Sequence, residues 1–438
     1  VTYNIYGEIF KGSWQDGMRL MFNRRYLYDL ATFDDSLYQR EDLKWIRSSY
    51  LIILQMSWDR QFYDRFTGKS GFADFLAEYN RLFGHVDVYG IWPTWPRLGL
   101  DERNQWDMYR DLPGGVASLK NISWQAKLND CRFFIAYNPW DNSTRTEDHL
   151  QGMADLISLT EADGVVLDTR GNSSSELQTA ADNVRKGVVM LSEGMAVVKD
   201  MPGIISGRVH NAIFLSPELN LNRLIKPEFA IFRVADVGED VLHREISVAF
   251  FNGYGTELNL FRPGGRGDEY RRDLQYLAST TFILRQNSDA FLDSQWIPLV
   301  STTTDKIYVN KWNSGDKTIF TVLNMDHRGV DTLLFEADRM DGKHLVSLWN
   351  HEELNPVLKN GRSMVPAKAA GWDPRDDGTR RESSVDCIAL LPDLLQVKLK
   401  GNRLHLASGR RGEITLWKSH PGYDSSPVTL KSPVDTLL

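Results

Sequence analysis

Cysteine is scarce in this sequence. The chain of 438 residues has only two, Cys131 and Cys387, and they stand in separate apolar runs, CRFFIAY and DCIALL. So low a count argues against a disulfide framework and against a cysteine-rich metal site. We therefore expect two buried free thiols, which behave in a protein core like small apolar side chains.

Long apolar runs and one-sided charge are also missing. No stretch reaches the roughly 18 to 20 apolar residues of a membrane-spanning helix. The chain has 51 basic and 58 acidic residues, a net charge of -7, and no basic stretch that suggests a nucleic-acid surface. Gly-x-Gly-x-x-Gly turns, Gly-x-Ser-x-Gly elbows and His or Cys clusters at metal-ligand spacing are absent too. We expect no membrane span, nucleic-acid partner, metal or cofactor, and the oligomeric state stays open.

Aromatic residues, by contrast, are abundant, with 13 Trp, 16 Tyr and 20 Phe. Sugars present C–H faces that stack on aromatic rings, so this enrichment suits a carbohydrate-binding cleft. Large barrels and sandwiches also bury many aromatic side chains. Composition alone does not decide between these two readings.

The pattern between Tyr50 and about residue 292 is a regular alternation of short apolar runs and helix-like segments. Continuous apolar runs are typical of strands that are covered on both faces. The predicted strands are 50–56, 85–92, 131–138, 164–168, 188–193, 210–215, 229–235 and 257–261. Eight such units match the size of a (β/α)8 TIM barrel. A doubly wound open sheet is the competing architecture.

The remaining chain divides into two further regions. Residues 295–438 contain short alternating runs separated by Gly, Asn and Asp turns, which predicts an antiparallel β-sandwich domain. No residue in that sandwich stands out as a second site. Residues 1–49 are partly helical in pattern, and we expect a segment that packs on the barrel of residues 50–294. The sequence leaves open whether this segment covers the barrel mouth.

Polar and aromatic residues follow several of the predicted strands. In barrels of this kind the site lies at the carboxyl ends of the strands, where the βα loops converge. The candidates for substrate binding are Trp58, Asp59, Trp92, Trp95, Tyr137, Asn138, Asp141, Arg170, Arg233, Asp236 and Arg262. Alternatives remain for several of them: Trp92 and Trp95 suit a stacking platform or a packing plug, and Arg233 suits a substrate contact or a salt bridge to Asp236.

Two acids, Asp168 and Glu193, end successive predicted strands, GVVLD and VVMLSE. Adjacent parallel strands are about 4.8 Å apart, so the two carboxylates are expected about 5 Å apart, the separation in retaining glycosidases. Asp168 is then the nucleophile, kept ionised by nearby Arg170. Glu193, in apolar surroundings, is the acid/base. The alternative is that each acid caps a helix or binds loop amides, and Asp141 is a reserve acid.

With the sandwich that follows, GVVLD…VVMLSEG resembles retaining α-glycosidases of the α-amylase-like and endo-α-N-acetylgalactosaminidase-like barrel groups. It looks closest to an uncharacterised branch of glycoside hydrolases from gut Bacteroidetes. The architecture is shared over residues 50–438, the motif over about 31 residues. In those groups an Asp ends strand four and a Glu ends strand five, which implies catalytic roles for Asp168 and Glu193.

The chain also departs from these groups. The amylase pattern has an Arg two residues before the nucleophile, where this chain has Val166, and its strand-seven His-Asp pair is missing from FRVAD. The expected function is a retaining, α-acting glycoside hydrolase with an oligo- or polysaccharide substrate. The alternatives are a non-catalytic carbohydrate-binding barrel and a barrel enzyme of unrelated chemistry, such as a lyase or an isomerase. We expect a periplasmic or extracellular location, although the sequence contains no targeting segment.

Overall fold

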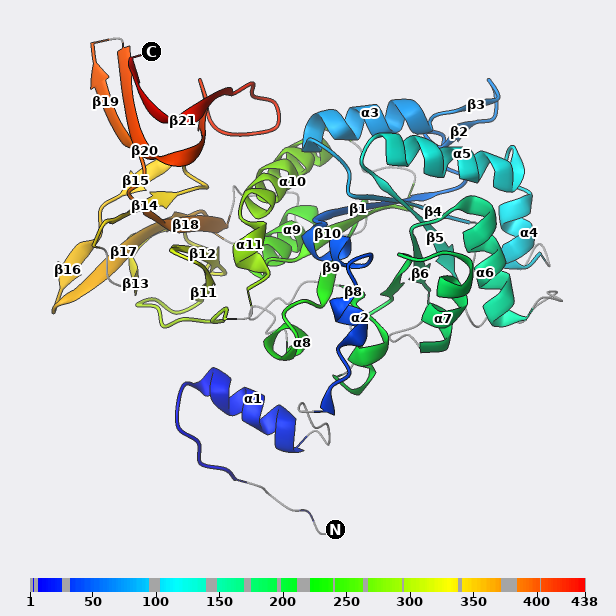
Figure 1. Ribbon diagram of the computed structural model, residues 1–438, viewed down its shortest axis with the longest axis horizontal. Helices are drawn as coiled ribbons and strands as arrows, with labels where there is room; N and C mark the ends of the chain where they lie inside the picture. The colour runs from blue at the N-terminus through cyan, green and yellow to red at the C-terminus, as the bar shows by residue number, and fades with distance from the viewer. Residues whose placement is uncertain are drawn as a thin grey trace.

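A closed parallel barrel forms the centre of the protein in a computed structural model (Figure 1). The structure describes residues 3, 7–25, 32–93, 103–138, 148–168, 175–194, 198–210, 221–238, 241–262, 267–293, 295–337, 341–371, 384–401 and 403–437. The barrel strands, in chain order, are β1 (Leu51–Met56), β4 (Val88–Trp92), β5 (Arg132–Tyr137), β6 (Gly164–Leu167), β7 (Val189–Ser192), β8 (Ser206–Val209), β9 (Ala230–Asp236) and β10 (Gly255–Leu260). The predicted (β/α)8 barrel is confirmed.

The barrel strands are buried almost throughout, as their continuous apolar runs predict. The sixth strand is the exception, because its predicted range of 210–215 is wrong. The strand is Ser206–Val209, and within 210–215 only His210 is described, outside any strand. The short segment SGRV contains a glycine and a buried arginine, whereas NAIFL has the stronger apolar signal.

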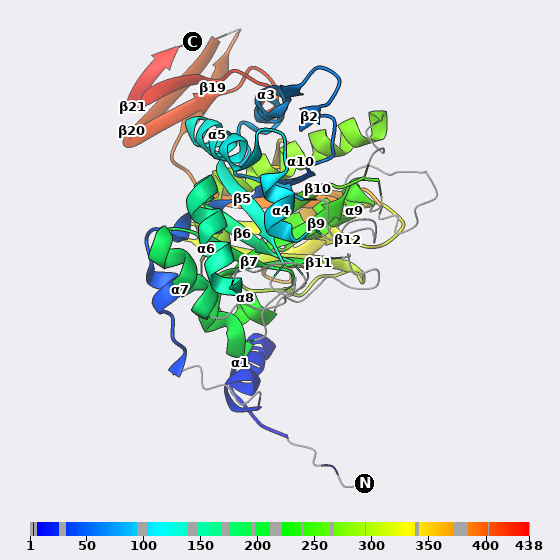
Figure 2. The same ribbon diagram turned by 90° about the vertical axis from the view of Figure 1, so that its right-hand side faces the viewer.

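Helices surround the barrel (Figure 2). They are α3 (Phe72–Phe83), α4 (Gln105–Arg110), α5 (Gly115–Leu128), α6 (His149–Thr160), α7 (Ser175–Val184), η3 (Val198–Gly203), α8 (Leu221–Ile225), α9 (Leu242–Phe251), α10 (Asp268–Gln286) and α11 (Ser288–Phe291). Asp148 begins α6 by accepting hydrogen bonds from the amides of Leu150 and Gln151. A small hairpin, β2 (Tyr63–Asp64) and β3 (Lys69–Ser70), follows β1. Within the described ranges, no helix has the length and apolar character to cross a bilayer.

The N-terminal segment contains α1 (Trp14–Arg25), α2 (Ser36–Gln39) and η2 (Lys44–Ser48). The hydroxyl of Tyr38 donates to the carbonyl of Ile204, 2.9 Å away and just before β8. Arg40 pairs with Asp182 near the end of α7. These contacts place residues 32–49 at the N-terminal ends of the barrel strands. The segment therefore packs on the barrel at the end opposite the predicted site, while α1 lies farther out (Figure 1).

Antiparallel sheets follow the barrel, as predicted. One sheet has the order β11-β12-β18-β14-β15 and a second β13-β17-β16, and their facing side chains form a separate apolar core. The third sheet, β19-β20-β21, was not predicted as a separate unit. The strands β15, β16, β17 and β21 were not predicted at all. The strands are β11 (Ile307–Ser314), β12 (Lys317–Asn324), β13 (Val330–Glu336), β14 (Lys343–Ser347), β15 (Glu352–Leu354), β16 (Val357–Lys359), β17 (Arg362–Ala369), β18 (Val385–Pro392), β19 (Gln396–Lys400), β20 (Arg403–Leu416) and β21 (Val428–Leu437).

The five-stranded sheet is covered on its other face by the barrel helices. The carbonyl of Phe251, at the end of α9, accepts hydrogen bonds from Asn310 and Thr321 of that sheet. Both cysteines are buried free thiols, as expected, one in the barrel and one in this sheet. The barrel and the face of the five-stranded sheet that packs against it therefore share one continuous apolar core, which is distinct from the core between the two sandwich sheets.

Candidate active site

The acids Asp168 and Glu193 stand at equivalent positions of neighbouring strands. Leu167 of β6 pairs with Ser192 of β7, and each acid is the next residue along. The amide of Asp168 still donates to the carbonyl of Tyr137 at 2.9 Å, and that of Glu193 to the carbonyl of Leu167 at 3.2 Å. Sheet-like pairing thus continues through both acids and holds them at one rim of the barrel.

Arg208 shows which side of the sheet these residues face. Its guanidinium lies 3.0 Å from Oε1 of Glu193 and 2.7 Å from Oε1 of Glu257 on β10. It also lies 5.2 Å from the ring centre of Trp92 on β4. The contacts with Glu257 on β10 and Trp92 on β4 reach strands that are not neighbours of β8, so these side chains occupy the barrel interior.

The electrostatics of this cluster centre on the same arginine. Burial lowers the pKa of Arg208, but the negative charges of Glu257, Glu193 and Asp168 outweigh burial, and its pKa is raised overall. Arg208 is therefore a permanent cation within electrostatic reach of three carboxylates. Arg170, which was expected to keep Asp168 ionised, lies outside the described residues.

The cluster opens to water at Glu193. Its side chain is 26% exposed, whereas those of Arg208 and Glu257 are 2% and 0% exposed. His210, just after β8, lies 3.6 Å from Glu193 and is 41% exposed. Glu193 thus combines a buried partner with access to solvent, as a group that exchanges protons with water requires, and Asp168 is partly exposed as well.

An aromatic wall stands beside the acids. The Trp92 ring packs on Phe261, with ring centres 5.2 Å apart, and covers the guanidinium of Arg208. Trp92 is only 5% exposed, so it is mainly a packing residue here, although at the end of β4 it borders the mouth. Its cation–π contact helps to fix Arg208 under the acids.

Of the other predicted residues, two lie at or next to a strand end, three are described by their exposure, and three lie outside the described residues. Asp236 ends β9, where it pairs in register with Asn259, and Asn138 follows β5, with its backbone amide bound to the side chain of Gln105. Trp58 is 42% exposed, and Arg262, which follows β10, is exposed as well. Asp59 is only 6% exposed, and its carboxylate accepts a hydrogen bond from the backbone amide of Gln61. Trp95, Asp141 and Arg170 lie outside the described residues.

Tyr137 and Arg233 do not face the mouth. The Tyr137 hydroxyl donates to the carbonyl of His149 in the helix layer, 2.6 Å away. Arg233 is fully buried, with Nε 2.7 Å from Glu245 of α9, in place of the expected rim position or salt bridge to Asp236. Side chains alternate along a strand, and both residues have the helix-facing parity. Neither is therefore placed to touch a substrate in the barrel mouth.

Arg208 and Glu257 were missed in the sequence. Arg208 stood outside every predicted strand, because the sixth strand was assigned to NAIFL. Glu257 begins the run ELNLF, where a charged residue at a strand start is ordinarily exposed. An assignment of SGRV as a strand would have placed Arg208 within the barrel sheet.

Comparison with known proteins shows the fold. No protein-family model and no curated protein matches the chain. Similar solved structures include an α-amylase from Geobacillus thermoleovorans, with a TM-score of 0.52 and 11% identity over 79% of this chain and 98% of that one. A maltogenic α-amylase from Thermotoga neapolitana has a TM-score of 0.51 and 14% identity over 75% and 97%. A cyclomaltodextrinase has a TM-score of 0.55 and 12% identity, covering 79% of each chain. The chain therefore shares the barrel-and-sheet architecture of these enzymes.

Proposed function

We propose that this protein is a retaining, α-acting glycoside hydrolase in which Asp168 is the nucleophile and Glu193 the acid/base. The observation that carries the proposal is that both acids stand at equivalent positions of neighbouring strands. Both also interact electrostatically with the same buried cation, Arg208. The fold shared with α-amylases and a cyclomaltodextrinase supports the substrate class, a glycan.

The reaction proceeds in two displacements. Asp168 attacks the anomeric carbon while the glycosidic C–O bond breaks, and Glu193 gives its proton to the departing oxygen. A water molecule then attacks the same carbon and loses its proton to Glu193, which breaks the bond to Asp168. Two inversions retain the anomeric configuration, and both residues return to their starting states.

The charge of the cluster supports this division of roles. Asp168 and Glu193 both act on the charge of the same guanidinium, and repulsion between two neighbouring carboxylates favours a proton on one of them. Glu193 is 26% exposed and lies beside the exposed His210, so it is placed to carry this proton and to exchange it with water. Esterification of Asp168 removes one negative charge, which favours proton loss from Glu193 just when a base is needed.

The alternative of a non-catalytic carbohydrate-binding barrel rested on the missing arginine at Val166 and the missing His-Asp pair. Arg208 brings a guanidinium to the acids from β8 instead of β6. Asp236 supplies a carboxylate at the end of β9. These two residues favour the catalytic reading.

The test is a screen of aryl α- and β-glycosides with Asp168→Asn, Glu193→Gln and the exposed control Glu176→Gln. Asp168→Asn is expected to reduce hydrolysis to background, and Glu193→Gln to reduce kcat by about 10² to 10⁴-fold. Azide added to Asp168→Gly is expected to yield a glycosyl azide of inverted configuration. Hydrolysis that survives both acid substitutions contradicts the proposal, and glycan binding without any hydrolysis favours the non-catalytic alternative.

A further inference from the structure

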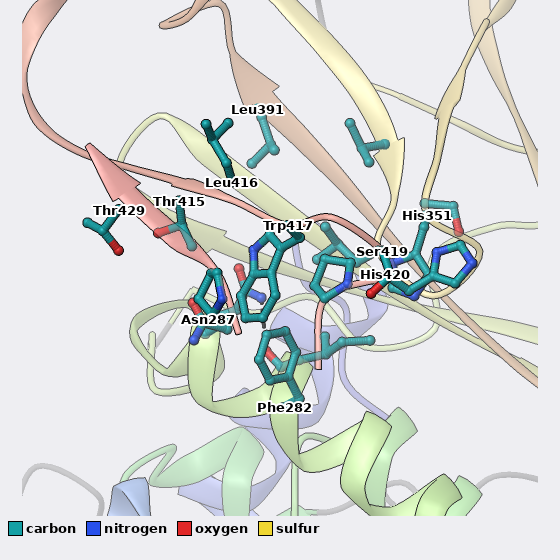
Figure 3. Close-up of a pocket in the computed structure, with 17 residues that line it drawn as sticks. Phe282, Asn287, His351, Leu391, Thr415, Leu416, Trp417, Ser419, His420 and Thr429 are labelled. Carbon is teal, nitrogen blue, oxygen red and sulfur yellow. Dashed lines mark hydrogen bonds between the residues drawn. The ribbon is translucent and has the colours of Figure 1, made fainter. Parts of the chain in front are cut away.

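A cavity lies where α10, the sandwich and the third C-terminal sheet meet (Figure 3). Its volume of about 850 Å³ falls within the roughly 300–1,000 Å³ of small-molecule sites. The last turn of α10 forms one wall. Arg285 in that turn binds Asp87, whose carboxylate accepts the amides of Tyr50 and Leu51 at the start of β1. The cavity is therefore at the N-terminal end of the barrel, away from the catalytic mouth.

Aromatic rings form the floor and one end of this cavity. Trp417 meets Phe282 of α10 edge-to-face, with ring centres 5.7 Å apart and planes at 84°. His351 and His420 stack with ring centres 4.6 Å apart. Figure 3 shows the indole in the middle of the cavity, the histidine pair at one side and Thr415 and Thr429 at the other. Flat ring faces and edges of this kind suit the C–H face of a sugar or another flat apolar surface.

The lining carries no formal charge. Its 17 residues include no Asp, Glu, Lys or Arg, although such residues make up 25% of the chain. Burial and the neighbouring His420 also lower the pKa of His351, which keeps that ring neutral at physiological pH. A phosphate, a nucleotide or an acidic sugar would find no countercharge here, so the lining fits an uncharged ligand.

Polar groups are nevertheless available around the rings. The indole N–H of Trp417, the hydroxyls of Thr415 and Thr429 and the amide of Gln286 have no hydrogen-bond partner within the portion of the chain that the structure describes. A purely apolar ligand would leave these groups unpaired when it displaced water. A ligand with apolar faces and several hydroxyl groups satisfies both features of the lining.

We propose that this cavity is a second, non-catalytic binding site for a neutral oligosaccharide. It holds a segment of glycan at the opposite end of the barrel from the mouth, and so raises the affinity for long chains without touching the bond that is cleaved. The inference rests on the proposed function for its ligand class, because a glycan-cleaving enzyme is the protein that gains from such a site.

The test uses isothermal titration calorimetry of the full chain carrying Asp168→Asn, with maltoheptaose, cellohexaose and xylohexaose as probes. At least one probe is expected to show two sites, and Trp417→Ala should weaken the second by about tenfold or more. Trp124→Ala, on the 57% exposed face of α5, is the matched control and should retain both sites. Thr415→Val removes one hydroxyl from an exposed strand position and is the second variant should Trp417→Ala fail to fold.

A single site for every probe, or a second site unaffected by Trp417→Ala and Thr415→Val, overturns the inference. Trp417-dependent binding of an oligogalacturonate as tight as that of the neutral probes overturns it too. With Asp168 restored, Trp417→Ala should leave kcat/KM for aryl glycosides unchanged and raise KM for the polymer. Trp417-dependent binding without any hydrolysis contradicts only the proposed function, whereas hydrolysis with binding indifferent to Trp417 contradicts only the second site.

Discussion

At the scale of single residues, the one positive charge of Arg208 interacts with three carboxylates, those of Asp168, Glu193 and Glu257. Glu257 is fully buried, so loss of the arginine leaves a carboxylate without countercharge in the barrel interior. We expect Arg208→Met to destabilise the protein by about 3 to 5 kcal/mol, measured as a fall in the thermal midpoint. The remaining activity should require higher pH on the acidic limb, because carboxylates without a neighbouring cation ionise less readily.

A second substitution separates charge from packing. Arg208→Met/Glu257→Gln should recover much of the lost stability, since no uncompensated charge remains. Arg362→Met breaks an exposed pair with Glu336 and should cost at most about 1 kcal/mol. Equal losses for Arg208→Met and for the double variant would show that Arg208 stabilises the barrel through packing alone.

Asp386 on β18 makes stability depend on pH. Burial raises its pKa to about 6 despite hydrogen bonds from Ser347 and the amides of Lys368 and Cys387. The folded state therefore holds the proton more tightly than the unfolded chain, whose pKa is near 3.8. The free energy of unfolding should fall by about 3 kcal/mol as pH rises from about 4 to above 6. Urea titrations at several pH values should show this fall in the parent but not in Asp386→Asn, with the exposed Asp331→Asn following the parent.

Single residues also show how far the sequence predicts the site. Asp168 and Glu193 were found because each is the first residue after a barrel strand that is formed by an apolar run, GVVL or VMLS. Tyr137 and Arg233 were placed at the rim for the same reason, yet both face the helices. A strand covered on both faces has no apolar–polar alternation, so its sequence does not tell which residues point inward.

At the scale of elements, β6 carries Asp168 and depends on close packing to β5. A Cβ atom at Gly164 would overlap the ring of Phe134 on the neighbouring strand. We expect Gly164→Ala to cost about 1 to 3 kcal/mol and to lower kcat, because the displaced strand moves the nucleophile. Gly267→Ala, where a Cβ meets nothing within 4 Å, is the control and should change neither quantity. A Gly164→Ala variant with full activity would mean that the site tolerates movement of β6.

Elements were predictable where one segment carried its own signal. Seven barrel strands have apolar runs long enough to recognise, whereas the sixth, SGRV, is too short and polar. The cavity beside Trp417 combines the end of α10 with segments near residues 346–351 and 415–429. No local sequence pattern predicts a site that is assembled from segments so far apart in the chain.

At the scale of the whole molecule, barrel and sandwich share a core through Trp312. This side chain of β11 is fully buried and stacks on Trp296, with ring centres 4.9 Å apart and planes at 11°. It also packs on Phe291 of α11 and under the guanidinium of Arg223, which holds the carbonyls of Asn252 and Gly253 in the barrel. An apolar interface with buried hydrogen bonds couples the two units more firmly than the polar interfaces typical of mobile domains.

This coupling predicts that the two units unfold together. Calorimetry should show a single transition for the parent, and Trp312→Ala should lower its midpoint without splitting it, at a cost of about 3 to 5 kcal/mol. The exposed Trp124→Ala should change stability by no more than about 0.5 kcal/mol. Two transitions in the parent, of which Trp312→Ala moves only one, would show that barrel and sandwich are independent. In that case the cavity beside Trp417, which needs both units in place, would open as soon as the less stable one unfolds.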